Sequence, residues 1–333
     1  MKVLKWLCKC FLAGLTAVAI LCLIFLCYTF TPVHKENPLG NTDYNWPANA
    51  HWFKMTEGIS SGRFDANGFN NLAVVQNPDI LFVGSSHMEA TDVPQDKNAA
   101  YFLEQKLDRQ YSVYNMGISS HGFTKVCSLL PKTLALYEQA PKYIIIEISS
   151  VSIPQDSIES FLQGTIPYLP SASNGLVTNL QRLPFARLAY YQISNGLLDL
   201  FMPAQNGAAE DAQEPPANEN AYDMFFQRVS ETVKDTGTQL IIFYHPTEQF
   251  QKDGSIAYDT DPDTLALFTE KCEKYAITFV DMTQPFMKMY EEQNKVPHGF
   301  ITGRIGFGHL NADGHEAIAQ TLAETITQLE REG

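Results

Sequence analysis

The chain has 333 residues, a formal net charge of −14 and 12% aromatic residues. Its length allows one large domain or two small ones. Its acidity, without any block of Lys and Arg, argues against nucleic-acid binding, which depends on clustered basic side chains. Four of the six cysteines fall in or beside an apolar N-terminal segment. The other two, Cys127 and Cys272, lie on predicted helices and are expected as buried free thiols rather than as a disulfide.

Residues 10–32 are predicted to anchor the chain in a membrane. No charged residue occurs from Cys10 to Phe30, and about 20 apolar residues suffice to cross the hydrocarbon core. Three lysines within residues 1–9 favour a cytoplasmic tail, which places the body of the protein outside the membrane. A cleaved signal peptide is the alternative, but bulky residues stand where a cleavage site needs small ones. We therefore expect a single-pass protein of the cell membrane.

Five short apolar runs predict the strands of a sheet. Each is rich in β-branched or aromatic residues and is bounded by polar or turn residues. Helical patterns lie between them, and strands that alternate with helices indicate a mainly parallel sheet covered on both faces. We expect a tether and lead-in at 33–73, rich in Asn, Gly and Pro, followed by one α/β domain at 74–333. The five predicted strands are 79–83, 112–115, 143–148, 239–244 and 277–281.

An insertion at about 149–220 interrupts this alternation. Its first part carries four prolines, and residues 203–220 contain no Lys or Arg, which is typical of a flexible loop. It follows the third predicted strand and therefore lies at the carboxyl side of the sheet. A lid or substrate wall and a plain surface excursion are both consistent with this composition.

Ser86 follows the first predicted strand directly. Ligands of α/β folds bind outside the carboxyl ends of the strands. Gly84 allows a tight turn there, and such a turn presents a serine hydroxyl as a nucleophile. An ordinary turn at a strand end explains the same residues without any chemistry, because Gly and Ser are common in turns.

His309 lies just before the last predicted helix, for which Asn311 is a natural N-cap. A histidine in this loop would supply a general base to Ser86, and a histidine buried against its own helix is the alternative.

Small residues after the second strand, Gly117 among them, allow the backbone to approach a ligand closely. Their N–H groups would join that of Ser86 in an oxyanion hole, whereas an ordinary Gly/Ser loop is the other interpretation.

Together these three segments resemble the SGNH (GDSL-like) hydrolase superfamily. Gly84-Ser85-Ser86 is similar to its nucleophile block, although Ser85 stands where Asp is usual. Residues 115–120 resemble the oxyanion block, and residues 309–315 resemble the last block, which carries the catalytic histidine. The resemblance implies a flavodoxin-like, three-layer α/β/α fold with a five-stranded sheet. It makes Ser86 the nucleophile and His309 the base, with N–H groups of Ser86, Ser120 and Gly117 as the oxyanion donors.

Two departures from the family pattern concern the orienting groups. Gly306 stands three residues before His309, where the family has Asp, and Ser149 and Ser150 replace the Asn of the third block. Asp281, at the end of the fifth predicted strand, is our first candidate for the missing acid, and Glu147 is the second. A Ser–His dyad without an acid is a further alternative. The loss of both groups is also consistent with a descendant that no longer catalyses, since losing the orienting Asp costs on the order of 10⁴ in rate elsewhere.

Membrane-anchored, outward-facing relatives in this superfamily include enzymes that move or remove acyl groups on cell-envelope polymers. The resemblance therefore implies a serine-dependent O-acyl (acetyl) esterase or acyltransferase that acts on an extracytoplasmic, carbohydrate substrate. A non-catalytic binding protein of the cell envelope with the same fold is the alternative. The expected partners are an acylated small molecule or polysaccharide and the membrane. We expect no cofactor and no metal, because the histidines have no zinc-like spacing in the sequence.

Overall fold

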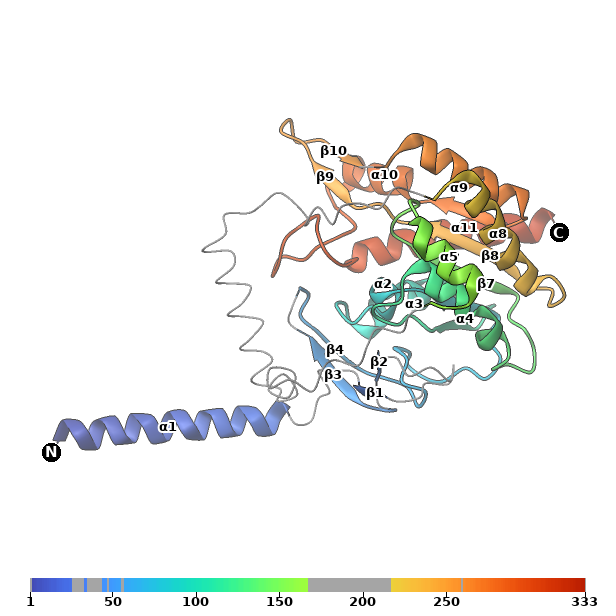
Figure 1. The fold of residues 1–333 in the computed structure, drawn as a ribbon. Coiled ribbons are helices and arrows are strands. Elements are labelled where there is room, and N and C mark those ends of the chain that lie inside the picture. The colour runs from blue at the N-terminus through green and yellow to red at the C-terminus, as the bar shows by residue number, and fades with distance from the viewer. Residues whose placement is uncertain are drawn as a thin grey trace.

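The computed structural model describes residues 2–25, 33–34, 44–46, 48–54, 57–166, 217–258 and 260–332. From residue 80 onwards, helices separate the five strands of one sheet along the described chain (Figure 1). In chain order the elements are α1 (Lys2–Phe25), β1 (Val33–His34), β2 (Tyr44–Asn45), β3 (His51–Lys54), β4 (Ser60–Arg63), β5 (Ile80–Val83), α2 (Ser86–Glu89), the 3₁₀ turn η1 (Gln95–Lys97), α3 (Ala99–Lys106), β6 (Val113–Asn115), α4 (Phe123–Leu134), β7 (Tyr143–Ile148), α5 (Gln155–Gln163), α8 (Glu219–Val233), β8 (Gln239–Tyr244), β9 (Glu248–Phe250), β10 (Ile256–Tyr258), α9 (Pro262–Lys274), β11 (Thr278–Asp281), α10 (Thr283–Gln293) and α11 (Ala312–Glu332).

The central sheet has five strands in the order β11-β8-β7-β5-β6. All four neighbouring pairs are parallel. The chain enters at β5, adds β6 on one side, and then builds outward on the other side through β7, β8 and β11. This is the flavodoxin-like strand order, in which ligands bind where the direction of building reverses. The structure confirms the predicted fold, and each of the five strands starts within one residue of its predicted position.

Helices cover both faces of this sheet, as Figure 1 shows. Successive strand residues point to opposite faces, so Leu81 and Ile144 pack in one core and Ile80 and Ile145 pack in the other. The first core contains buried side chains of α4, α5, α8 and α9, and the second contains those of α3, α10 and α11. Strands buried on both faces need continuous apolar character, which explains the Ile-rich sequence of β7.

The helix α1 is long and apolar enough to cross a membrane, and a signal sequence near the N-terminus has the same properties. Figure 1 shows α1 standing apart from the α/β body. The predicted anchor begins within this helix, whereas residues 26–32 lie outside the described part of the chain.

The described part of the predicted tether and lead-in contributes to the body. β3 and β4 form an antiparallel hairpin, and Trp52, Phe64 and Phe69 are almost fully buried. Asp65 accepts a hydrogen bond from the hydroxyl of Tyr114 in β6, at 2.8 Å. The hairpin therefore has a fixed place beside the carboxyl end of the sheet.

Two further predictions concern the cysteines of the body and the insertion. Cys127 and Cys272 are buried free thiols, as expected. The predicted insertion begins with α5, but its residues 167–216 lie outside the described part of the chain, so neither a lid nor a plain excursion is assigned to them.

Candidate active site

Ser86 and His309 meet at the carboxyl end of the sheet. Ser86 is the first residue of α2, which follows β5 after a two-residue turn, and His309 lies in the loop before α11. The two residues are 223 positions apart in sequence, yet His309 Nε2 lies 2.9 Å from Ser86 Oγ. At this distance the serine hydroxyl and the ring nitrogen form a hydrogen bond. Activation of a serine nucleophile requires this arrangement.

The local sequence explains why Ser86 lies where it does. Ser85 caps α2, because its hydroxyl accepts a hydrogen bond from His87 N. Ser85 N in turn donates to Glu147 Oε2 of β7, at 2.7 Å. A Cβ on Gly84 would lie 2.7 Å from the same carboxylate oxygen, so only glycine lets β7 approach the turn this closely.

Glu57 holds the other side of the His309 ring. Its Oε1 lies 2.8 Å from His309 Nδ1, and its Oε2 accepts the backbone N–H of His309 at 2.7 Å. Asp92 Oδ2 lies 3.6 Å from the same Nδ1 and forms an ion pair with Lys54 at 2.6 Å. A carboxylate can only accept, so Nδ1 carries the proton and Nε2 presents its lone pair to Ser86.

Glu57 and His309 shift each other's protonation. Burial by itself would lower the pKa of His309, but the hydrogen bond to Glu57 and the negative charge of Asp92 outweigh it, so the pKa is raised. Burial would likewise raise the pKa of Glu57, but the hydrogen bond and charge of His309 lower it. The site therefore favours a charged imidazolium beside an ionised carboxylate, which is the state that follows proton transfer from a serine.

The loop before α11 is shaped to admit Glu57. Gly308 has a φ of +94°, a conformation that favours glycine. A Cβ at this position would lie 2.2 Å from Glu57 Oε2. Any larger residue would therefore strain the loop and displace the carboxylate.

Neither acid expected from the sequence contacts His309. Asp281 binds the first residue of α10 instead: its Oδ1 accepts hydrogen bonds from Thr283 N at 2.9 Å and from Thr283 Oγ1 at 2.6 Å. Glu147 is bonded to Ser85 and to another histidine, His245. The proposed role of Asp281 is thus corrected: the carboxylate that holds the His309 ring is Glu57. The acid comes from the turn between β3 and β4 of the lead-in hairpin and not from a strand end.

The predicted oxyanion loop lies against α2. A Cβ on Gly117 would lie 2.3 Å from backbone atoms of Met88 and Glu89, so this glycine allows the two backbones to touch. Its N–H donates to Asn115 Oδ1 at 2.9 Å and is therefore not directed at a ligand, which corrects its expected role. Ser120 is exposed and has a left-handed φ of +66°.

Glu89 of α2 fixes this loop further. Its carboxylate accepts hydrogen bonds from the hydroxyl of Ser119 and, at 2.7 Å, from Trp46 Nε1. Glu89 is buried, so the loop, the lead-in segment and the helix that carries Ser86 are held together at one point. The Ser86 N–H is at the first turn of α2, where helical N–H groups have no partner within the helix.

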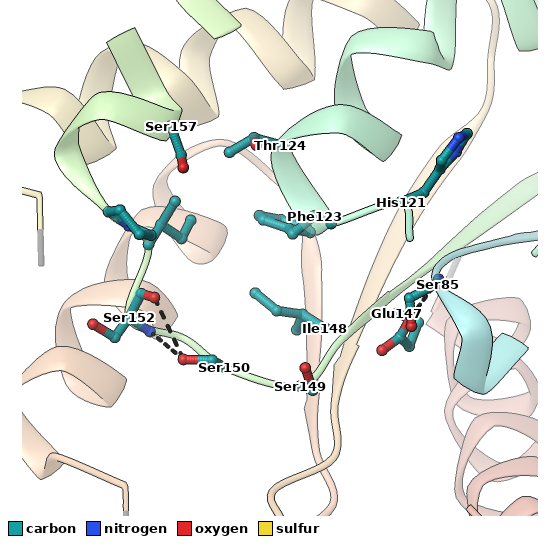
Figure 2. Close-up of a pocket in the computed structure, with 13 residues that line it drawn as sticks. Ser85, His121, Phe123, Thr124, Glu147, Ile148, Ser149, Ser150, Ser152 and Ser157 are labelled. Carbon is teal, nitrogen blue, oxygen red and sulfur yellow. Dashed lines mark hydrogen bonds between the residues drawn. The ribbon is translucent and has the colours of Figure 1, made fainter. Parts of the chain in front are cut away.

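A pocket of about 230 Å³ lies beside this site. Its lining includes Ser85, which follows β5, and Glu147 and Ile148 at the end of the neighbouring strand β7. Figure 2 shows Ser85 and Glu147 joined at one end, Thr124 and Ser157 at the other, and Phe123 between them. The lining is rich in hydroxyl groups, which come from Ser85, Thr124, Ser149, Ser150, Ser152 and Ser157.

Three further histidines gather next to the Ser86–His309 pair. His87, His245 and His298 each place one ring nitrogen within 4.8 Å of the other two. Burial lowers the pKa of His87 well below its ordinary value and also lowers that of His298, so both rings are neutral and able to act as ligands. Our reading of the sequence missed this cluster because positions 87, 245 and 298 have no local spacing in common.

Comparison with known proteins gives similarity of fold only. No family model matches the chain, and no curated protein matches it. Solved structures similar to it include an esterase from Pseudoalteromonas sp. (13% identity, 76% of this chain and 98% of that chain, TM-score 0.40). They also include a member of the lipolytic protein G-D-S-L family from Veillonella parvula (13%, 74% and 97%, 0.40). A third is a catalytic mutant of an acetylxylan esterase from Geobacillus stearothermophilus (12%, 76% and 95%, 0.38).

Proposed function

We propose that this protein is a serine-dependent O-acyl esterase or acyltransferase with Ser86 as nucleophile, His309 as base and Glu57 as the orienting acid. The observation that carries the proposal is the continuous chain of contacts from Ser86 Oγ through His309 Nε2, at 2.9 Å, and His309 Nδ1 to Glu57 Oε1, at 2.8 Å. A binding protein that had lost catalysis would have no reason to keep this chain. His309 also faces the nucleophile rather than the core, and 24% of its side chain is exposed.

The mechanism follows from these contacts. Ser86 Oγ attacks the acyl carbon while its proton moves to His309 Nε2, and Glu57 stabilises the resulting imidazolium. The N–H groups of Ser86 and Ser120 are the proposed donors to the oxyanion. Collapse of the tetrahedral intermediate breaks the ester C–O bond, and His309 returns its proton to the departing alcohol. Water or a second hydroxyl then attacks the acyl-serine, again with His309 as base.

The substrate class follows from the surroundings of the site. The pocket beside Ser85 is small, and six hydroxyl side chains line it together with His121, Phe123, Ile148, Ile153 and Pro154. These groups suit a sugar hydroxyl or a small acyl group such as acetyl better than a long apolar chain. The acceptor decides the reaction: water gives hydrolysis, and a sugar hydroxyl gives transfer.

The N-terminal helix supports a location at the cell membrane. Its apolar length is sufficient for one span, and lysines precede the uncharged stretch, which favours an extracytoplasmic catalytic domain. We therefore propose an acylated envelope carbohydrate as the substrate and the membrane as the second partner.

Labelling with a fluorophosphonate probe tests the nucleophile. The folded full chain in detergent should form one covalent adduct at Ser86, located by peptide mass spectrometry, and Ser86→Ala should form none. Ser255→Ala, which changes an exposed serine between β9 and β10, is the matched control and should label normally. A folded wild-type chain that does not label, or equal labelling of Ser86→Ala, would refute the proposal.

A product assay separates the two reactions. With an acetyl ester as donor, an esterase releases free acetate at the same rate whether or not an oligosaccharide is added. A transferase acetylates the oligosaccharide, and its acetate release falls as the acceptor concentration rises.

A further inference from the structure

His87, His245 and His298 come together from three separate parts of the fold. His87 is in α2, His245 directly follows β8, and His298 lies in the loop that leads to α11. The ring of His245 lies 4.5 Å from that of His87 and 5.5 Å from that of His298, measured between centroids. The side chains of His245 and His298 are fully buried, whereas His87 is partly exposed.

Two buried carboxylates determine which nitrogens of these rings carry protons. His245 Nε2 lies 2.8 Å from Glu147 Oε1, and His298 Nδ1 lies 2.7 Å from Glu248 Oε2. Each carboxylate also accepts a backbone N–H, Glu147 from Ser85 and Glu248 from His298. A carboxylate oxygen accepts hydrogen bonds from ring and backbone N–H groups. The protons of the two rings therefore lie on the nitrogens that face the carboxylates.

The other two nitrogens consequently face each other. His245 Nδ1 and His298 Nε2 are 3.3 Å apart, and in neutral rings both are lone pairs. Two lone pairs cannot form a hydrogen bond, so a cation or an additional proton must lie between them. A tetrahedral zinc ion, with Zn–N bonds of about 2.0–2.1 Å, holds neighbouring nitrogens about 3.3 Å apart.

The charges point to a divalent ion. Glu147 and Glu248 bring two negative charges into a buried site, and buried charges require compensation. One shared proton would leave one negative charge, whereas a divalent cation would leave none. A carboxylate that accepts the second N–H of a ligand histidine is also the usual outer contact of a zinc site.

We propose that His87, His245 and His298 bind one divalent transition-metal ion of the zinc class. His245 and His298 are the oriented ligands, and His87 completes the set from the partly exposed side. Leu310 N donates to His87 Nδ1 at 3.4 Å, a distance at the upper limit of a hydrogen bond. This weak contact does not prevent the His87 ring from turning toward the ion. Three protein ligands leave a fourth position for water.

The ion would position the catalytic residues. His87 is adjacent to Ser86, and its ring centroid is 5.1 Å from that of His309. His298 and His309 belong to the same loop, within which Gly299 N donates a hydrogen bond to His309 O at 2.9 Å. An ion shared by His87 and His298 would therefore connect the nucleophile's helix to the loop of the base.

Metal analysis of the full chain tests this proposal directly. The protein is purified in detergent without a polyhistidine tag, stripped with a chelator, and titrated with Zn²⁺. We expect one equivalent of tightly bound zinc by mass spectrometry of the metal, and a higher unfolding temperature, because an ion that binds only the folded state stabilises it. Co²⁺ in its place should give the visible absorption of a tetrahedral site. A folded wild-type chain that takes up no stoichiometric zinc would overturn the proposal and indicate a shared proton instead.

Variants separate this site from other histidines. His298→Asn should abolish the tight equivalent, and Glu248→Gln should weaken zinc binding by about 10-fold to 100-fold, as removal of an outer carboxylate does elsewhere. The matched control is His121→Asn, a buried histidine on the loop after β6, which should keep one equivalent. Unchanged zinc affinity in both site variants would refute the assignment. If His298→Asn does not fold, the wild-type titration and Glu248→Gln decide, and fluorophosphonate labelling of the same samples reports separately on Ser86.

Discussion

Two carboxylate–imidazole arrangements lie side by side at the carboxyl end of the sheet, and they differ in what the second nitrogen faces. In the first, Glu57 holds His309, whose other nitrogen faces the hydroxyl of Ser86 at a partly exposed position. In the second, Glu147 and Glu248 hold two fully buried rings whose free nitrogens face each other. Under the two proposals, the carboxylate orients the ring as a base where a hydroxyl lies opposite, and as a metal ligand where a second ring nitrogen lies opposite.

The largest expected effect on kcat comes from removing Ser86 or His309, the two residues in contact in the first arrangement. Ser86→Ala and His309→Ala should each lower kcat for an acetyl ester by about 10⁴-fold or more, and the double variant should lose little more, because residues that act as one unit are not additive. Steady-state kinetics on the three variants check this. Both single variants should still bind one equivalent of zinc, so loss of zinc in His309→Ala would contradict the separation of the two arrangements.

Removal of the acid has the next largest effect. Glu57→Gln should lower kcat by between about 10² and 10⁴, because the ring loses its charged partner while Asp92, 3.6 Å from Nδ1, still lies nearby. The catalytic base must be neutral, so activity rises as the pH passes upward through the pKa of His309. That pKa is raised in the wild type, and without Glu57 it falls. The acid limb of kcat/KM should therefore move to lower pH in Glu57→Gln. An unmoved limb would show that Glu57 does not act on the base.

A substitution at Gly308, in the loop that contacts Glu57, should have a smaller effect on kcat and should also lower the stability of the fold. Gly308→Ala places a Cβ at a φ of +94° and 2.2 Å from Glu57 Oε2. We expect a stability loss of about 1–3 kcal/mol from the backbone conformation and a fall in kcat of about 10²-fold from the displaced acid. Gly122→Ala is the control, since a Cβ there meets nothing within 4 Å and φ is −71°. Urea unfolding and kinetics of the two variants together check this, and equal behaviour of the pair would refute the argument.

The sequence predicted the sheet and the Ser86–His309 pair because both depend on local signals. Apolar runs mark the strands, and a small turn and a helix cap mark the two loops. Glu57 and the buried histidines carry no such signal. Glu57 lies 252 positions before His309 in the sequence, in a lead-in segment whose composition resembles a tether. It contacts the His309 ring only when the hairpin packs against the α/β body. His245 and His298 are 53 positions apart and meet only because β8 and the loop before α11 share one end of the sheet.

The smallest effect is expected from Asp281, the acid that the sequence suggested in place of Glu57. Asp281→Ala removes the two hydrogen bonds that its carboxylate accepts from Thr283 at the start of α10. Loss of hydrogen bonds to a carboxylate costs about 1.5–3 kcal/mol of stability. Because Asp281 does not hold the His309 ring, kcat/KM and its acid limb should stay within about two-fold and unshifted. A loss approaching the ~10⁴-fold expected for an orienting acid would restore Asp281 to the catalytic site. Kinetics of Asp281→Ala beside Glu57→Gln, at equal folded fraction by urea unfolding, therefore decide which carboxylate the base depends on.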